Sequence, residues 1–450
     1  MPFNALVQEK ILDFEQQGIP EVFQRDLKLS PIQTPARNNL AQVIVGTRRC
    51  GKTYRLFQEM HDVMACGHNL SNMLYFNFED ERLKPYTKEL LSDVVDTFFA
   101  LHPQAKEAGA FFFFDEIQEV PEWGLFLRRL IDSTKATVYV TGSSSRLLST
   151  ELASEFRGRS LSREMFPLSF SEYVRYTTGK EIARQQAYSP NDQAVLRNAL
   201  ARYLARGGYI TPLNLSPADG TMLLQEYAYR TVALDIVERY NLRTPQIARG
   251  FVSRCIASSG RELSINKVAN EFKSRGVKTS RETLAKLLEY YEESYLVFSL
   301  SDLSRAISDN SKSSSKVYAS DPGMLAAFSR AAANEEGQRL ETAVFNKLRR
   351  CTPSVRQGSL ARLRFEHQGK QHEVDFVAGD TLLGEVYQLA QVSVQIENQK
   401  TRKRELSALA AGMEKYGIGE SSLITMDTQE TVKTNNGTVR VEPAWSWLLD

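Results

Sequence analysis

An eight-residue segment, Gly46–Thr53, most constrains what this chain can fold into. It reads G-T-R-R-C-G-K-T and lies between the apolar run Val43–Val45 and a stretch with helical spacing that begins at Tyr54. When a strand ends in a G-x-x-x-x-G-K-[ST] loop and continues into a helix, several backbone N–H groups and the positive end of the helix dipole point at one place. The sequence therefore predicts a phosphate-binding loop at the end of a buried strand.

The loop predicts how a nucleoside triphosphate is held. The Lys52 ammonium reaches the β- and γ-phosphates, and the Thr53 hydroxyl is placed to ligate Mg²⁺. ATP is expected rather than GTP, because the sequence has no N-K-x-D segment of the kind that reads guanine. The predicted nucleotide-binding residues are Gly46, Thr47, Arg48, Arg49, Cys50, Gly51, Lys52, Thr53 and Tyr54.

Three further apolar runs follow the loop, at Met73–Phe78, Phe111–Phe114 and Thr137–Thr141. Their nearly continuous hydrophobicity is typical of strands that are covered on both faces of a parallel sheet. The runs alternate with stretches of helical spacing, so an α/β domain is expected over residues 37–165.

Two acids, Asp115 and Glu116, end the run of four phenylalanines. At the carboxyl end of a strand beside a phosphate loop, Asp115 would lie next to the Mg²⁺ and Glu116 would polarise the attacking water. The alternative interpretation is the acid-rich start of a helix.

The hydroxyl-rich turn at residues 141–145 follows the next strand. Thr141 or Ser143 is predicted to sense the γ-phosphate, and a turn that caps the next helix is the alternative. Arg159 is predicted to stabilise the charge of the transition state, within one chain or across a subunit interface, with an ordinary surface arginine as the alternative. The predicted catalytic residues are Glu116, Lys52, Ser143 and Arg159.

These motifs, together with F-P-L-S-F-S-E-Y at Phe166–Tyr173, resemble those of the prokaryotic AAA+-like P-loop ATPases that carry a C-terminal domain of uncharacterised function. The resemblance spans nearly the whole chain. It implies an ATP-hydrolysing enzyme with Asp115 at the Mg²⁺ and Glu116 as the catalytic acid, and a small helical lid over residues 166–243. Within that lid, Gly207–Gly208 is interpreted as a helix C-cap rather than a hinge.

Residues 244–320 resemble a winged helix. Two short helices flank the turn Ser274–Lys278, and strands are expected at Ser294–Leu300 and near Tyr318. If the second helix enters a major groove, the residues that contact DNA are Lys278, Arg281 and Lys286. A protein–protein spacer is the alternative, because several glutamates weaken the basic face.

Residues 321–450 resemble the core of restriction-endonuclease-like proteins, in which Glu341, Asp375 and Glu385 would form a second Mg²⁺ site. Active members carry a lysine two positions after the last acid, but position 387 here is a tyrosine. Lys370 or Lys400 could replace that lysine in space. A binding or assembly module is therefore expected in preference to an active nuclease.

A length of 450 residues predicts several domains, and a net charge of +2 shows that the chain has no overall basic character. A lead-in over residues 1–36 precedes the domains described above. Four scattered cysteines and the absence of a long apolar run predict a soluble, cytoplasmic protein with reduced thiols and no membrane association.

We therefore expect Mg²⁺-dependent ATP hydrolysis that drives conformational change in the winged-helix and C-terminal domains, in a nucleic-acid-associated or regulatory protein. The alternative is an ATP-regulated DNA-binding protein or nuclease. The candidate partners are ATP, DNA, further copies of the chain and an unknown protein.

Overall fold

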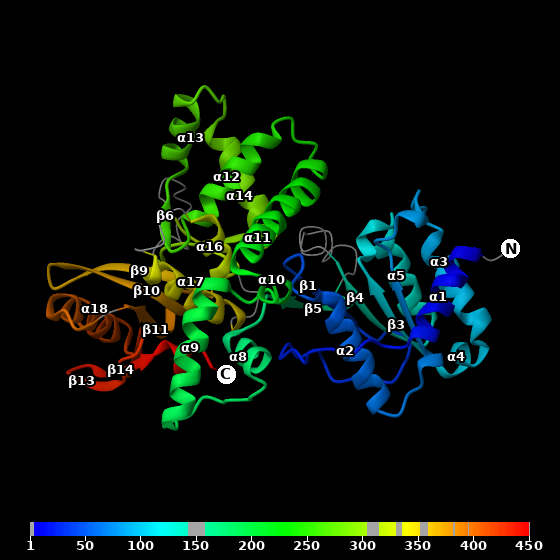
Figure 1. Ribbon diagram of the computed structural model, residues 1–450, viewed down its shortest axis with the longest axis horizontal. Coiled ribbons are helices and arrows are strands. Elements are labelled where there is room, and N and C mark those ends of the chain that lie inside the picture. The colour runs from blue at the N-terminus through cyan, green and yellow to red at the C-terminus, as the bar shows by residue number, and fades with distance from the viewer. Residues whose placement is uncertain are drawn as a thin grey trace. The chain divides into compact units, whose positions relative to one another are not determined.

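The structure is a computed structural model that describes residues 4–142, 158–303, 315–329, 335–351, 359–380, 383–394 and 396–449. The chain divides into two compact units, Met1–Met165 and Phe166–Asp450, here called unit 1 and unit 2 (Figure 1). The finer division into five segments stays a prediction.

A five-stranded parallel sheet forms the centre of unit 1 in the described residues. Its strands follow the order β2-β3-β4-β1-β5, and each neighbouring pair is parallel. The carboxyl ends of all five strands therefore meet at one edge, and the expected α/β fold is confirmed. The strands are β1 (Ala41–Gly46), β2 (Met73–Asn77), β3 (Ala110–Asp115), β4 (Ala136–Thr141) and β5 (Ser160–Met165).

Helices cover both faces of this sheet (Figure 1). One face packs against α1 (Ala5–Gln17), α3 (Leu90–Leu101), α4 (Pro103–Ala108) and α5 (Trp123–Ser133), and the other against α2 (Lys52–Ala65). In β3, Phe112 and Phe114 point to the first face, whereas Phe111 and Phe113 point to the second. All four are fully buried, which explains why this strand is hydrophobic at consecutive positions.

Unit 2 begins with helices and also contains a small antiparallel sheet of order β6-β8-β7, against which α12, α14 and α16 pack. The strands of this sheet are β6 (Arg261–Leu263), β7 (Val297–Leu300) and β8 (Ser315–Ala319). The helices are α8 (Phe170–Thr178), α9 (Pro190–Arg206), α10 (Ile210–Leu213), α11 (Pro217–Thr231), the π-helical η4 (Val232–Glu238), α12 (Pro245–Ala257), α13 (Ile265–Ser274), α14 (Arg281–Glu293) and α16 (Pro322–Phe328).

Gly207 caps the C-terminus of α9 with a φ of 71°, as the sequence predicts. A Cβ atom there would lie 1.8 Å from Oδ1 of the buried Asp321. That carboxylate accepts hydrogen bonds from the backbone N–H groups of Gly208 at 2.7 Å and Gly323 at 2.8 Å. The glycine pair therefore joins the end of α9 to the start of α16.

A six-stranded mixed sheet of order β13-β14-β12-β11-β10-β9 completes unit 2. The pairs β11–β12 and β12–β14 are parallel, and the others are antiparallel. This sheet confirms the α/β character expected of the C-terminal region. Its strands are β9 (Leu360–His367), β10 (Lys370–Asp380), β11 (Glu385–Val392), β12 (Glu420–Thr425), β13 (Glu430–Thr434) and β14 (Gly437–Pro443), and the helices are α17 (Glu336–Cys351), α18 (Gln399–Tyr416) and α19 (Ala444–Trp447).

The two sheets of unit 2 are joined by a fully buried arginine of β9, Arg362. Its guanidinium donates to Asp302 Oδ1 at 2.5 Å and to Glu262 Oε1 at 2.9 Å. A buried guanidinium must be paired, so this contact specifies how the small sheet meets the large one.

No helix in the described ranges is both long enough and apolar enough to cross a bilayer. The four cysteines are free thiols, with Cys50 and Cys255 buried and Cys66 and Cys351 exposed.

Candidate functional site

The phosphate loop leaves β1 at its carboxyl end and enters α2 at Lys52. A Cβ atom on Gly46 would lie 1.9 Å from the carbonyl oxygen of Met165, so only glycine fits beside β5. Gly51 has a φ of 100°, a conformation that glycine adopts at little cost, and a Cβ there would meet only ordinary contacts. One loop glycine is therefore required by packing and the other by the backbone turn.

The Lys52 side chain is buried inside this loop, with 5% of its surface exposed. Its Nζ lies 3.4 Å from the carbonyl oxygen of Gly46 and 3.3 Å from that of Thr47. The Thr47 hydroxyl is also buried, and no described residue forms a hydrogen bond with it. A buried ammonium and an unsatisfied hydroxyl in a loop that precedes a helix N-terminus fit the phosphates of a nucleotide.

Asp115 is the centre of a hydrogen-bond network at the carboxyl edge of the sheet. Its Oδ2 accepts from the Thr53 hydroxyl at 2.7 Å and from the Tyr75 hydroxyl at 3.1 Å, and its Oδ1 accepts from the Thr141 hydroxyl. The carboxyl is fully buried, and burial, followed by the charge of Glu116, raises its pKa. Hydrogen bonds from Thr141 and Thr53 oppose that rise.

The structure thus brings Thr53 and Asp115 together, as the sequence predicts. Hydroxyl and carboxylate oxygens are the protein ligands that suit Mg²⁺ beside substrate phosphates, so these two residues fit that ion. Burial, and then the charge of Asp115, raises the pKa of Tyr75, which keeps this phenol protonated as a donor.

Glu116 lies next to this network and is partly exposed. Its backbone has a φ of 53°, an uncommon conformation for a residue with a side chain, of the kind that clusters at functional sites. Its N–H donates to the Thr141 hydroxyl at 3.2 Å, and its Oε2 accepts from Gln118 Nε2 at 2.6 Å. Thr141 therefore connects the two acids through one hydroxyl group.

The other predicted loop residues support the loop or face outward. Arg48 lies 3.9 Å from the carboxylate of Glu79, and Cys50 is buried with its sulfur against the Met165 carbonyl. Arg49 and Tyr54 are exposed.

Ser143 lies outside the described residues, so its predicted role as a sensor stays a prediction.

Arg159 lies within the described residues, and the prediction that it acts at the phosphate site of its own unit is wrong. Arg159 directly precedes β5, so it lies at the edge of the sheet where β1 and β5 begin. The loop lies at the opposite edge, because it follows Gly46, which pairs with Met165 at the end of the two strands. Six strand residues separate the two edges by about 16 Å, and Arg159 instead pairs with Asp132. A role across a subunit interface stays a prediction.

Sequence reasoning missed Arg25, in the segment before β1. Its Nη1 donates to the Cys50 carbonyl at 2.8 Å. Gln58 of α2 bonds to both the N–H and the carbonyl of Arg25, at 2.8 and 3.1 Å. No motif or periodicity marks this arginine, because its position depends on an irregular segment folding back onto the loop.

A second polar cluster, here called the Lys316 cluster, lies in unit 2 and consists of Lys316, Tyr318, Glu341 and Asp375. The ammonium of Lys316 donates to Glu341 Oε1 at 2.9 Å and to Asp375 Oδ1 at 3.0 Å, and the Tyr318 hydroxyl donates to Glu341 Oε1 at 2.7 Å. Burial by itself would lower the pKa of Lys316, but the two carboxylates outweigh burial and raise it. A protonated lysine thus lies between two of the acids predicted to bind Mg²⁺.

The prediction that Glu385 joins this pair is wrong. Glu385 opposes Asp380 near the hairpin that joins β10 and β11, whereas Asp375 lies one residue beyond the pair Phe376 and Ala390. The side chain of β11 that contacts Asp375 is Gln391, whose Oε1 accepts from the Asp375 N–H at 3.0 Å. The described residues contain no group of three His, Cys, Asp or Glu side chains placed to hold a metal ion.

The fold is a parallel sheet with a phosphate loop after its first strand, and a hydrogen-bonded acid lies at the end of a nearby strand. This combination defines a P-loop nucleotide-binding protein. A family model described as an AAA domain matches residues 38–174, and a domain of unknown function matches residues 197–335. The chain belongs to the AAA-type P-loop ATPases of prokaryotes.

The chain is 32% identical over 455 residues to an uncharacterized protein of Methanocaldococcus jannaschii, covering 99% of this chain and 96% of the relative. It is 27% identical to an uncharacterized protein of Haemophilus influenzae, over 75% of this chain and 79% of that protein. Among solved structures, it is similar to a Walker-type ATPase of Pyrococcus abyssi, with 16% identity, a TM-score of 0.41, and coverage of 65% of this chain and 91% of that one.

Proposed function

We propose that this chain binds ATP with Mg²⁺ at the Gly46–Thr53 loop and hydrolyses it. The observation that carries the proposal is the 2.7 Å hydrogen bond between the Thr53 hydroxyl and Asp115 Oδ2, beside the buried ammonium of Lys52. Such a pair would supply the protein ligands of a Mg²⁺ ion at the end of a phosphate loop.

Each residue then has a defined task. Lys52 and the loop N–H groups bind the phosphates, and Thr53 and Asp115 hold the metal ion, which when bound offsets negative charge on the phosphate oxygens. Glu116 orients a water molecule and accepts its proton on a carboxylate oxygen, while Thr141 holds the backbone of Glu116 in its left-handed conformation. ATP fits better than GTP, because the chain lacks a guanine-reading segment.

Two variants test these tasks separately. Lys52→Ala removes the phosphate-binding ammonium, and we expect ATP affinity to fall below detection by calorimetry. Glu116→Gln keeps the shape of the side chain but not its basicity, and we expect ATP to bind while turnover falls about 100-fold or more. The matched control is Glu119→Gln, three residues later. If Glu116→Gln hydrolyses ATP at the rate of the control, the assignment of Glu116 is wrong.

We further propose that ATP turnover in unit 1 changes the conformation of unit 2. Within unit 2, the buried ion pair of Arg362 with Asp302 connects the small sheet to the large one, so that a change in one sheet would be passed to the other. Hydrogen exchange measured with ADP and with a non-hydrolysable ATP analogue should differ in peptides of unit 2. Identical exchange in the two states would contradict the proposal.

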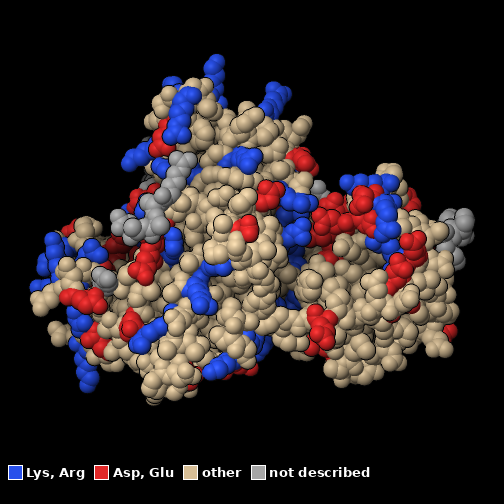
Figure 2. Space-filling model, in the orientation of Figure 1, with Lys and Arg blue, Asp and Glu red and all other residues tan. Residues whose placement is uncertain are grey.

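DNA binding by unit 2 is the second candidate function. The helix α14 packs against β7 of the small antiparallel sheet and against α13, and Lys278, Arg281 and Lys286 are exposed at and after the turn that joins the two helices. Figure 2 shows Lys and Arg side chains on the end of unit 2 that carries α13. This arrangement resembles a winged helix whose second helix presents basic side chains.

The test is fluorescence anisotropy with double-stranded DNA at several salt concentrations. Replacing the three basic residues by Gln should lower the slope of log affinity against log salt by about 0.9 for each phosphate that the variant no longer neutralises. An unchanged slope would show that this surface does not bind DNA. We do not propose nuclease activity, since Lys316 lies between the acids and Glu385 is remote.

A further inference from the structure

We propose that unit 2 contains a second binding site, unrelated to the phosphate loop, for a small phosphorylated ligand with a planar ring, of the nucleoside monophosphate class. The site is a cavity of about 560 Å³ between α11, α12, α13 and the end of α16. This volume is within the range of about 300–1,000 Å³ that is usual for small-molecule sites.

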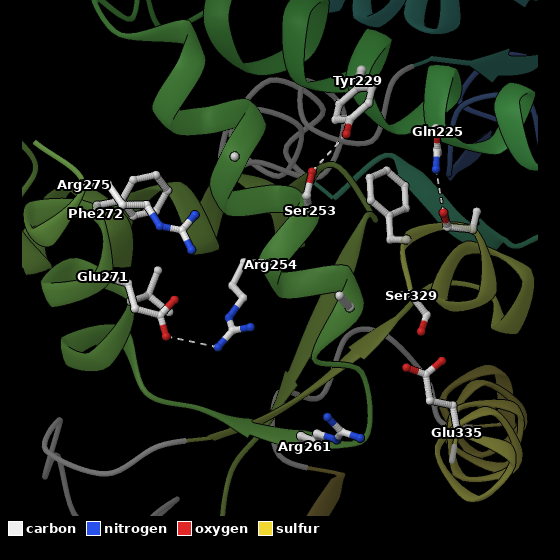
Figure 3. Close-up of a pocket in the computed structure, with 15 residues that line it drawn as sticks. Gln225, Tyr229, Ser253, Arg254, Arg261, Glu271, Phe272, Arg275, Ser329 and Glu335 are labelled. Atoms are coloured by element: carbon white, nitrogen blue, oxygen red, sulfur yellow. Dashed lines mark hydrogen bonds and ion pairs between the residues drawn. The ribbon is translucent and has the colours of Figure 1, made fainter. Parts of the chain in front are cut away.

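Three guanidinium groups from different elements line this cavity (Figure 3). Arg254 belongs to α12, Arg261 to β6, and Arg275 ends α13. Arg254 is paired with Glu271 at 3.3 Å. No carboxylate among the described residues pairs with the side chain of Arg261 or Arg275. Two guanidiniums that have no carboxylate partner in the described part of the chain favour an anion at this cavity, and their planar forks suit phosphate oxygens.

Aromatic rings supply the second feature. Phe272 of α13 and Phe328 of α16 line the cavity together with Tyr229 of α11. Gly250 lets the Phe272 ring lie against α12, because a Cβ there would already be 3.4 Å from the ring. Stacking of a base on such a ring contributes about 1–3 kcal/mol and tolerates any planar heterocycle. A ligand with both a phosphate and a ring would therefore use two walls of the cavity.

Glu335 supplies the third feature. It lines the cavity, only 6% of its surface is exposed, and Oε2 accepts no hydrogen bond from any residue that the structure describes. Among the described residues, the cation that pairs with it is Arg339, whose Nη2 is 3.7 Å from Oε2, beyond hydrogen-bond distance. A buried carboxylate oxygen without a donor is costly, and ribose hydroxyls or an amino group of a base are donors of the required kind.

The test uses isothermal titration calorimetry on the full chain carrying Lys52→Ala, so that the phosphate loop contributes no binding. The probes are adenosine monophosphate, adenosine, inorganic phosphate and a double-stranded oligonucleotide. We expect adenosine monophosphate to bind at least tenfold more tightly than adenosine or phosphate. Adding Arg261→Gln and Arg275→Gln should weaken that binding about 10- to 100-fold for each charged hydrogen bond removed.

The matched control is Lys273→Gln, an exposed lysine of α13 that does not line the cavity. It should leave the affinity unchanged, and circular dichroism should show that both arginine variants are folded. The proposal is overturned if adenosine monophosphate shows no saturable heat, if phosphate binds equally well, or if the arginine variants bind like the control. Arginine-dependent binding of the oligonucleotide alone would also overturn it, in favour of a nucleic-acid surface.

Discussion

Replacing Lys316 by Met tests how the Lys316 cluster stabilises unit 2. Methionine keeps most of the volume of the lysine but removes its charge. The ammonium is nearly buried and lies within 3.0 Å of both Glu341 Oε1 and Asp375 Oδ1. The substitution therefore leaves two facing carboxylates without the cation between them.

The size of the effect follows from this geometry. Two oxygens that each lie about 3 Å from one tetrahedral nitrogen are about 5 Å apart, and their repulsion is about 3 kcal/mol at an effective dielectric constant of 20. Removing one partner of a buried ion pair generally costs about 3 to 5 kcal/mol. We therefore expect unit 2 to lose about that much stability at pH 8.

The loss should depend on pH. Burial, and then the charge of Asp375, already raises the pKa of Glu341 in the parent protein, and losing the ammonium raises it further. An acid whose pKa is higher in the folded state contributes stability at low pH, and that stability disappears as pH rises through the folded pKa. The difference between variant and parent should therefore shrink on acidification, by up to about 1.4 kcal/mol per pH unit.

Hydrogen exchange measured by mass spectrometry is the appropriate assay, since it resolves local stability in a chain of several units. At pH 8, exchange in peptides of β8, α17 and β10 should accelerate about 100- to 4,000-fold, while peptides of β1 to β4 stay unchanged. The matched control is Lys370→Met, an exposed lysine on the strand of Asp375. The reasoning is refuted if the variant is protected as well as the parent at pH 8. It is also refuted if the variant loses equal protection at pH 5.5 and pH 8, after correction for intrinsic exchange rates.

Three further substitutions test contacts around the phosphate loop and at the junction of α9 with α16. Gly46→Ala would place a methyl group 1.9 Å from the Met165 carbonyl oxygen, and we expect it to destabilise unit 1 by about 3 kcal/mol or more. Thermal unfolding measures this loss, and an unchanged melting temperature would contradict the expectation. Arg25→Met removes the hydrogen bond to the Cys50 carbonyl and should weaken ATP binding about tenfold without unfolding unit 1. Calorimetry measures the affinity, and an unaltered value would exclude a role of Arg25 in supporting the phosphate loop. Gly207→Ala would press on the Asp321 carboxylate at 1.8 Å, so limited proteolysis should cut unit 2 faster than in the parent, and equal rates would argue against this contact.

Short-range patterns were enough to predict the centre of unit 1. The loop motif, the four apolar runs and the Asp115–Glu116 pair each depend on residues next to one another in the chain. Because parallel strands end at one edge, a motif at the end of β1 and an acid at the end of β3 must come close. The contact between Thr53 and Asp115 follows from that rule.

Only the tertiary structure decided which distant residues meet. The register of β5 against β1 places Arg159 at the edge opposite the loop, and the register of β11 against β10 places Gln391 rather than Glu385 beside Asp375. A shift of a few residues in strand pairing changes such contacts completely, and the sequence pattern alone does not specify it. No local sequence pattern marked Lys316 or Arg25 as a site residue, for the same physical reason. The partner of each, Asp375 for Lys316 and Cys50 for Arg25, is remote in the sequence and comes close only when the chain folds.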